Sequence, residues 1–159
     1  MIAAIDTNII LDILIPNEPF CASSQKLLEG YLSKGKLIIC EIVLAELAAQ
    51  FPSEEDLNQF LFETGIRLEY SGKKSLYLAG ARWAKYIKKN SKNLFNCSRC
   101  GQEFEFYCPR CRSVVTRRQH VLGDFLIAAH ALERAECLLS RDLGIYKTYF
   151  SNLRVIGSI

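Results

Sequence analysis

The first fourteen residues, MIAAIDTNIILDIL (1–14), begin with an apolar run of five residues that stops at Asp6. This run has the length and composition of a buried β-strand, so we predict a strand over residues 1–5. The polar residues Thr7 and Asn8 then separate Asp6 from a second apolar stretch. A carboxylate among apolar residues is costly unless it is paired or bound to a cation. Asp6 therefore marks both the end of a strand and a candidate site.

The rest of the chain alternates predicted strands with predicted helices. We expect further strands at residues 37–40, 137–139 and 153–156, the last at a sheet edge, and helices around residues 20–33, 42–50, 53–64, 73–90 and 123–135. This alternation favours an α/β domain with a parallel sheet of four or five strands covered on both faces. A length of 159 residues suits a single domain, here residues 1–159.

Inside the helix expected at 73–90, apolar residues recur at helical spacing. The predicted core-facing stripe consists of Leu76, Ala79, Gly80, Trp83 and Ile87.

Three further acids occupy positions comparable to that of Asp6. Glu46 interrupts the stretch IVLAELAA (42–49), Asp124 opens DFLIAAHAL (124–132), and Asp142 follows CLLS (137–140). A single one could be a helix-end residue that the helix dipole favours. Because ligands of parallel sheets gather beyond the carboxyl ends of the strands, the four together predict one shared site. Carboxylate oxygens suit Mg²⁺ or Mn²⁺.

Two polar residues could support such a site. Asn8 lies two residues after Asp6, where it could orient that carboxylate or a water molecule, or equally cap a helix. Ser140 precedes Asp142 and could donate a hydrogen bond to a ligand carboxylate.

Four segments resemble the signature segments of PIN-domain ribonucleases, in particular the VapC toxins of prokaryotic toxin–antitoxin modules. They are DTNIILDIL (6–14), VLAEL (43–47), GDFLIAAHAL (123–132) and LLSRDLGIY (138–146). WAKYIKK (83–89) and YFSNLRV (149–155) are also similar to VapC segments, so the resemblance spans nearly the whole chain except residues 91–117. It implies a PIN-like three-layer α/β/α fold and an Mg²⁺- or Mn²⁺-dependent endoribonuclease.

The resemblance also implies roles and partners. Asp6, Glu46, Asp124 and Asp142 match the acidic quartet of the family; the three aspartates are expected to bind the metal, and Glu46 to act through water or at a second ion. The expected partners are RNA, an antitoxin protein and a second copy of the chain. Two alternatives stay open: a PIN endonuclease of ribosomal RNA processing, and a non-catalytic RNA- or protein-binding module built on a zinc ribbon.

Residues 91–117 form an insertion that the resemblance does not explain. The segment NCSRCGQEFEFYCPRCR (96–112) carries two Cys-x-x-Cys pairs, Cys97 with Cys100 and Cys108 with Cys111. This pattern predicts a structural Zn²⁺ bound by four thiolates, with iron in the same cage or a redox-active pair as alternatives. The residues EFEFY between the pairs alternate as in a short β-ribbon. The remaining Cys21, Cys40 and Cys137 are expected to be small buried hydrophobic residues.

Charge is distributed unevenly. The chain carries a net charge of +3, but residues 85–120 contain nine Lys or Arg and two Glu, a local +7 against −4 elsewhere. A basic surface beside an acidic pocket is what a metal-dependent nuclease needs. The candidate RNA contacts are Arg110, Arg112, Arg117 and Arg118.

The composition is that of a globular protein, with 50% apolar and 23% charged residues. We find neither a run of the roughly 20 apolar residues that would cross a membrane nor a signal peptide. We therefore expect a cytoplasmic protein without disulfides.

Overall fold

The computed structural model describes residues 1–15, 19–89, 95–96, 103–114 and 122–157. Its centre is a parallel sheet of five strands in the order β3-β2-β1-β6-β7. The strands are β1 (Ile2–Ile5), β2 (Lys36–Ile39), β3 (Ile66–Leu68), β6 (Cys137–Leu139) and β7 (Val155–Ile156). Strand β1 is central, because Ala3 pairs with Leu37 of β2 on one side and Cys137 of β6 on the other. The predicted α/β class and parallel sheet are confirmed.

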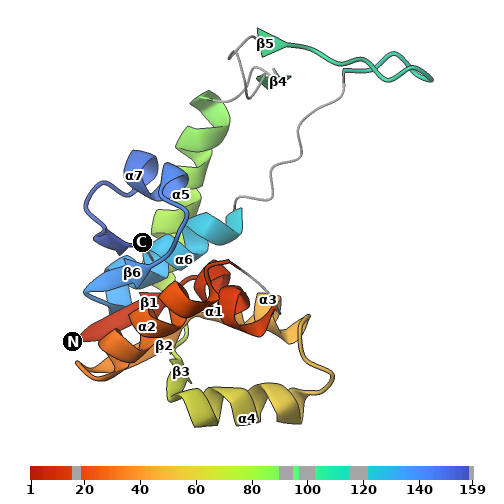
Figure 1. Cartoon of the computed structure of the whole chain (residues 1–159). Helices are drawn as coiled ribbons and strands as arrows, with labels where there is room; N and C mark the ends of the chain where they lie inside the picture. Colours follow the sequence, from red (N-terminus) through yellow and green to blue (C-terminus); the bar gives the residue numbers. More distant parts are fainter. Residues whose placement is uncertain (16–18, 90–94, 97–102, 115–121, 158–159) are drawn as a thin grey trace.

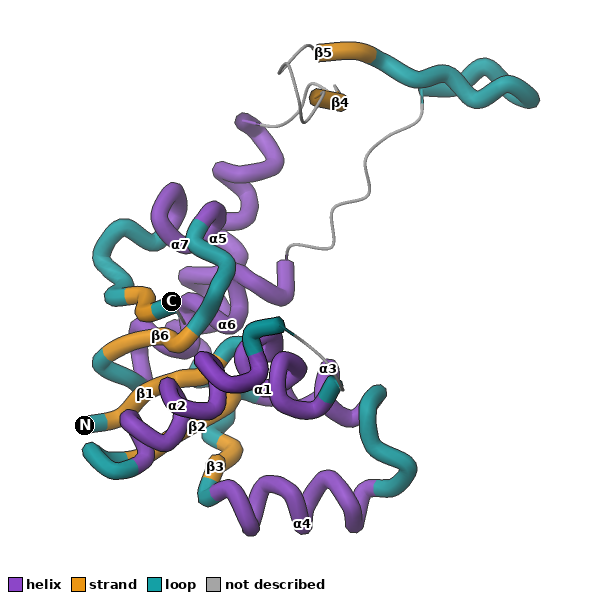
Figure 2. The backbone as a smooth tube through the Cα atoms, viewed as in Figure 1, coloured by secondary structure: helices purple, strands orange, loops and turns teal. Residues whose placement is uncertain are grey.

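Helices cover both faces of this sheet (Figures 1 and 2). They are α1 (Thr7–Leu14), α2 (Cys21–Leu32), α3 (Glu41–Ala48), α4 (Glu54–Thr64), α5 (Lys73–Lys89), α6 (Leu122–Arg134) and α7 (Gly144–Tyr149). Helices α1 and α2 pack together on one side, and α5 packs along α6 on the other. The result is the expected three-layer arrangement.

The central strands are apolar throughout because helices cover both of their faces. Ala3, Ala4 and Ile5 of β1 are all buried, as are the last three residues of β2 and all of β6. Helix α6 contributes the largest share of the helical core, with Phe125 and a run of small buried residues against the sheet. This rigid centre fixes the positions of the residues that follow each strand.

Helix α4 shows how local sequence sets an element's ends. The Ser53 hydroxyl accepts a 3.1 Å hydrogen bond from the amide of Asp56 and so caps the helix start. Gly65 ends the helix in the left-handed conformation, with φ of +68°, which glycine adopts without strain. Both ends agree with the prediction.

The predicted stripe on α5 is confirmed only in part, because Ala79 is buried and Trp83 packs against the core while its other members do not. Leu76, Gly80 and Ile87 are exposed, whereas Ser75 and Ala79 are buried. Ser75 joins the buried face, and Glu133 of α6 accepts hydrogen bonds from both its amide and its hydroxyl. That bond draws a polar residue into the contact between α5 and α6.

Part of the insertion forms a two-stranded antiparallel ribbon. Strand β4 (Phe95–Asn96) pairs with β5 (Glu103–Phe104), with Phe95 opposite Phe104. The ribbon expected within residues 103–107 is therefore found only in part, because β5 covers Glu103–Phe104 alone and its partner strand precedes the first cysteine pair. This ribbon lies beyond the carboxyl end of α5 (Figure 1). Cys97, Cys100, Arg117 and Arg118 lie outside the described residues. Among the helices of the described ranges, none combines the length and apolar character needed to cross a membrane.

Candidate metal centre

The site lies where the strand order of the sheet changes direction. The chain proceeds from β1 to β2 on one side, while β6 pairs on the other side of β1. In open parallel sheets, the carboxyl ends of two such strands border a crevice that binds ligands. Asp6 follows β1 at this point and residues 140–142 follow β6, joined by a 2.9 Å hydrogen bond from the Asp6 amide to the Leu139 carbonyl.

All four acids of the predicted quartet line one open hollow of about 360 Å³. They come from four segments: Asp6 from the end of β1, Glu46 from α3, Asp124 from the first turn of α6, and Asp142 from the loop after β6. The other lining residues are Thr7, Asn8 and Leu11 of α1. The structure thus brings together acids that are up to 136 positions apart in the sequence.

Asp6 is held by hydrogen bonds at a single oxygen. It occupies the cap position of α1, yet its side chain makes no capping hydrogen bond. Instead, Oδ2 accepts from Asn8 Nδ2 at 2.8 Å, from the Ser140 hydroxyl at 2.6 Å and from the Tyr146 hydroxyl at 2.9 Å. The carboxylate is therefore fixed toward the hollow rather than used to start the helix.

Ser140 and Asn8 connect this carboxylate to the loop that bears Asp142. The Ser140 hydroxyl accepts hydrogen bonds from Asn8 Nδ2 at 3.1 Å and from the Asp142 amide at 3.0 Å. Asn8 Oδ1 accepts from the Arg141 amide at 3.1 Å. Asn8 thus contacts both the Asp6 carboxylate and the backbone of the loop.

Glu46 has its own partner. The Thr7 hydroxyl donates a hydrogen bond to Glu46 Oε2, which fastens α3 to the start of α1. The sequence pattern indicated no part in the site for either Thr7 or Tyr146. The signal for Tyr146 was its place at the end of the matched segment LLSRDLGIY; the contact with Asp6, 140 positions away, has no local signature.

The electrostatics of the hollow are repulsive. Burial raises the pKa of Asp124 to about 7, and the negative charges of Asp6, Asp142 and Glu46 add to the effect. Burial also raises the pKa of Asp6, against the opposing effect of its hydrogen bonds. A cation in the hollow would relieve both costs, desolvation and mutual repulsion.

The donor set fits Mg²⁺ or Mn²⁺. Within the described ranges, no three acidic, histidine or cysteine side chains stand close enough to form a finished ligand set. The acids line the hollow without closing on one point, and this suits Mg²⁺, which keeps several water ligands and binds few carboxylates directly. The mutual repulsion of the four carboxylates indicates a cation site, because a cluster with a purely structural role would gain nothing from that repulsion.

Comparison with known families identifies the domain. The family model described as the PIN domain matches residues 3–96, more than half of the chain. The chain belongs to the PIN-domain family. The match includes Asp6 and Glu46, while Asp124 and Asp142 join the same hollow through the fold. No curated protein sequence matches significantly.

Solved structures share this PIN fold over nearly the whole length. VapBC2 from Rickettsia felis, bound to a promoter DNA fragment, is 20% identical with a TM-score of 0.61, covering 99% of this chain and 98% of that one. VapBC-1 from nontypeable Haemophilus influenzae is 21% identical (TM-score 0.59; 99% and 98% covered). VapC20 from Mycobacterium tuberculosis, a sarcin–ricin loop cleaving toxin, is 12% identical (TM-score 0.54; 96% and 98% covered). At these identities the likeness establishes the fold.

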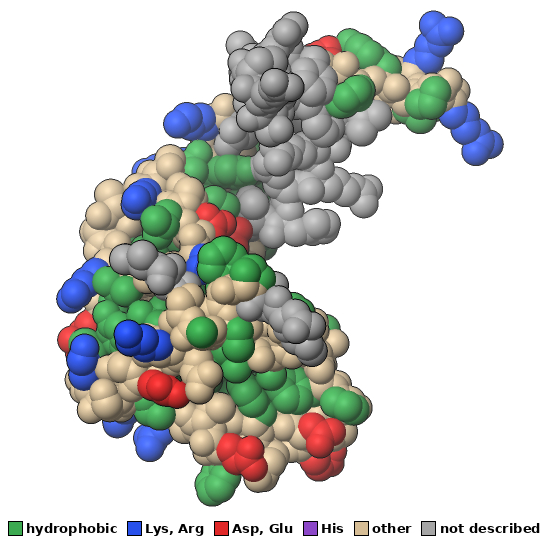
Figure 3. Space-filling view, viewed as in Figure 1, with side chains coloured by type: hydrophobic (Ala, Val, Ile, Leu, Met, Phe, Trp, Pro, Cys, Tyr) green, Lys and Arg blue, Asp and Glu red, His purple; other side chains and the backbone are tan. Residues whose placement is uncertain are grey.

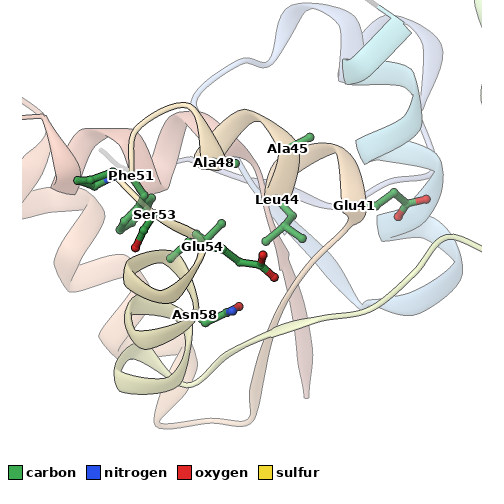
Figure 4. Close-up of a pocket in the computed structure, with 10 residues that line it drawn as sticks. Glu41, Leu44, Ala45, Ala48, Phe51, Ser53, Glu54 and Asn58 are labelled. Carbon is green, nitrogen blue, oxygen red and sulfur yellow. The ribbon is translucent and has the colours of Figure 1, made fainter.

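A larger hollow of about 530 Å³ lies between α3 and α4 (Figure 4). Its wall is largely apolar, with Leu44, Phe51 and Leu57 among the lining residues. Glu41, at its edge, already accepts hydrogen bonds from the amide and hydroxyl of Ser71. The hollow therefore gathers no set of free catalytic groups, and we assign it no chemistry.

The second cysteine pair of the insertion lies on a tight turn. The Arg112 amide donates to the Cys108 carbonyl and the Cys108 amide to the Ser113 carbonyl, both at 2.8 Å, and Arg112 takes a φ of +56°. Hydrogen bonds with Ser113 and Cys108 lower the pKa of Cys111 to about 7. Arg110 and Arg112 are exposed on this turn, and Figure 3 shows Lys and Arg side chains extending into solvent at this end of the molecule.

Proposed function

We propose that this PIN-domain protein is a metal-dependent endoribonuclease that acts as the toxin of a VapBC-type toxin–antitoxin module. The observation that carries the proposal is the convergence of four acids from four segments on one hollow at the sheet edge. Four clustered carboxylates repel phosphate, so a pure RNA-binding module would gain nothing from them. The names of the similar structures, VapBC2, VapBC-1 and VapC20, support the assignment to a toxin.

In this proposal Asp6, Asp124 and Asp142 hold Mg²⁺ or Mn²⁺, and Glu46 acts through water or at a second ion. A bound ion would lower the pKa of its water ligand and neutralise negative charge on the phosphate. The protein's own contribution is to keep the carboxylates in place. Asn8, Ser140 and Tyr146 hold Asp6, while Thr7 holds Glu46.

The test is cleavage of RNA by the purified protein in Mg²⁺, in Mn²⁺ and in excess EDTA. We expect cleavage only with metal, and its loss in Asp6→Asn and Asp124→Asn. Glu55→Gln, an exposed charge on α4 outside the hollow, is the matched control and should cleave like the wild type. Circular dichroism verifies that the variants are folded. Undiminished cleavage by both aspartate variants contradicts the nuclease proposal.

The toxin assignment has a separate test. We propose an antitoxin partner, in line with the similar structures VapBC2 and FitAcB, the latter from Neisseria gonorrhoeae. We also propose a homodimer. Expression of the chain alone should arrest bacterial growth, and Asp6→Asn should abolish the arrest. Co-expression with a small neighbouring reading frame should restore growth and yield a complex by size-exclusion chromatography. Cleavage without growth arrest favours an RNA-processing enzyme instead.

We also propose that Cys97, Cys100, Cys108 and Cys111 bind one structural Zn²⁺. The spacing of the two Cys-x-x-Cys pairs supports this, and so does the ribbon of β4 and β5, whose two strands flank the first pair in the sequence. A segment of this size cannot bury a core of its own, so metal binding would supply its folding free energy.

A further inference from the structure

Arg141 stands between two residues of the candidate metal centre and is fastened to α1 at two points. Its amide donates to Asn8 Oδ1 at 3.1 Å, and its guanidinium forms an ion pair with Asp12. Asn8 and Asp12 are four residues apart, so they lie on the same face of α1. The same face of α1 therefore hydrogen-bonds to the backbone of Arg141 and forms the ion pair with its side chain.

Asp12 is buried, with 1% of its side chain exposed. Its Oδ1 meets Arg141 Nη2, and its Oδ2 accepts a 2.6 Å hydrogen bond from the Ser24 hydroxyl of α2. The Arg141 guanidinium also lies over the ring of Phe20, 4.2 Å from the centroid. In the sequence Asp12 looks like an ordinary charge on a helix face, but the structure buries it against a partner 129 positions away.

Stability is a poor explanation for this ion pair. Removing a carboxylate such as Asp12 from water is costly, and well-packed apolar residues of similar volume often serve a fold equally well. A charged pair does supply a fixed geometry, since the planar guanidinium binds a carboxylate in few orientations. The residues on either side of Arg141 are Ser140, which bonds to Asp6, and Asp142, which lines the hollow.

We propose that Asp12 and Arg141 form a positioning pair that holds the segment 140–142 against α1 and thereby sets the metal affinity of the acidic hollow. The inference rests on the proposed metal site. The pair acts in two ways. It fixes the loop from which Ser140 and Asp142 reach the hollow, and it keeps the Arg141 guanidinium on Asp12, where this cation does not compete for the acids.

The test must separate positioning from folding. A single neutralisation such as Arg141→Met leaves the buried charge of Asp12 without its partner and can unfold the protein. The triple variant Asp12→Leu/Ser24→Ala/Arg141→Met removes both charges and the hydroxyl together, so its thermal stability should stay near that of the wild type. Mn²⁺ affinity is measured by calorimetric titration without RNA. We expect binding about tenfold weaker, the usual lower bound for loss of a residue that orients a metal ligand.

Arg82 offers a matched control. Its guanidinium also lies over an aromatic ring, 4.4 Å from the Phe150 centroid, and donates to the Tyr149 carbonyl at 2.9 Å, away from the acids. Arg82→Met should lower thermal stability and leave Mn²⁺ affinity unchanged. Arg141→Lys keeps the charge but loses the planar fork, so we expect Mn²⁺ affinity between those of the wild type and the triple variant.

Wild-type Mn²⁺ affinity in the triple variant overturns the positioning pair. If that variant does not fold, unchanged affinity in Arg141→Lys overturns it equally. A wild-type protein that binds no Mn²⁺ also overturns it. The proposed nuclease function fails separately, if the wild type binds Mn²⁺ but cleaves no RNA. In that case the Mn²⁺ affinities of the wild type and the variants still decide whether the positioning pair exists.

Discussion

The Tyr146 hydroxyl donates a 2.9 Å hydrogen bond to Oδ2 of Asp6, linking the last helix of the domain to the end of its first strand. Tyr146 is fully buried. Burial raises its pKa far above the usual range, and the charges of Asp6 and Asp124 raise it further. The hydroxyl therefore remains protonated at any physiological pH, and it can only donate to Asp6.

Tyr146→Phe should weaken metal binding with little loss of stability. The ring stays in the core, and only the donor to Asp6 disappears, so we expect Mn²⁺ affinity to fall about tenfold. Unfolding should become easier by about 1 kcal/mol, the usual net worth of one hydrogen bond. Tyr149→Phe is the control: Tyr149 lies in the same helix and packs its ring on Tyr86 and Phe125. Equal affinities in the two variants contradict a role for the Tyr146 hydroxyl.

Asp124→Asn should stabilise the metal-free protein at high pH. The pKa of Asp124 is raised from 3.8 to about 7, so the folded state holds its proton more tightly than the unfolded state does. On this account stability is full below about pH 4 and falls as the pH rises toward 7. The variant does not lose stability in this way, because asparagine does not ionise. We expect a gain on the order of 1–2 kcal/mol at pH 8, after allowance for solvent screening of a partly exposed group.

The measurement is urea unfolding in EDTA at several pH values. The difference between variant and wild type should vanish near pH 4. His130 does not disturb this difference: burial lowers its pKa, so protonation in acid destabilises both proteins alike. Saturating Mn²⁺ should reverse the order above pH 7 by stabilising only the wild type. A variant less stable than the wild type at pH 8 contradicts the repulsion described for the hollow.

The sequence predicted best what depends on neighbouring residues. The apolar runs of β1, β2 and β6 and the ends of α4 are encoded within a few positions, and they agree with the structure. The four acids were recognisable because each follows, interrupts or opens an apolar run. The sheet then places them together, since all of its strands run parallel.

Contacts between distant residues were not predictable. In the sequence, Asp12 resembles any acid on an amphipathic helix, and only the fold places Arg141 beside it. Thr7 likewise resembles a capping residue, and only the fold brings its hydroxyl to Glu46. On α5, the apolar spacing located Ala79 and Trp83 correctly but not Ser75. Ser75 is a polar residue that donates hydrogen bonds to Glu133 of another helix, and a pattern of apolar positions cannot include such a contact. Strand β3 and helices α1 and α7 were not predicted as elements.

One zinc ion per chain is expected in protein purified without added metal. Four thiolates at this spacing bind Zn²⁺ tetrahedrally, so elemental analysis should give about one zinc and X-ray absorption four sulfur ligands. Cys108→Ser/Cys111→Ser should lose the metal and unfold the insertion while the sheet remains intact. Cys21→Ser, on α2, is the control and should retain zinc. Iron in place of zinc, or disulfides among these cysteines, contradicts the prediction.

The last prediction concerns the role of the basic insertion. Residues 85–120 carry a net charge of +7 and lead directly into α6, whose first turn bears Asp124. We expect this segment to bind the phosphates of the RNA backbone rather than a partner protein. Binding to single-stranded RNA should then weaken steeply with salt, with a logarithmic slope of roughly −0.7 per phosphate contact.

Replacing Arg110, Arg112, Arg117 and Arg118 with Gln should weaken RNA binding and flatten that slope, by as much as about three units if each contacts a phosphate. Binding is measured in EDTA, so that cleavage does not interfere. The control removes the same charge from exposed positions of the main domain, Lys26, Lys34, Arg67 and Lys73, and should keep the wild-type slope. Mn²⁺ affinity should be unchanged in both. Identical slopes for the insertion variant and the wild type would contradict RNA binding by the insertion, because a segment that neutralises no phosphates releases no counterions. A protein contact would then be the remaining role for the insertion.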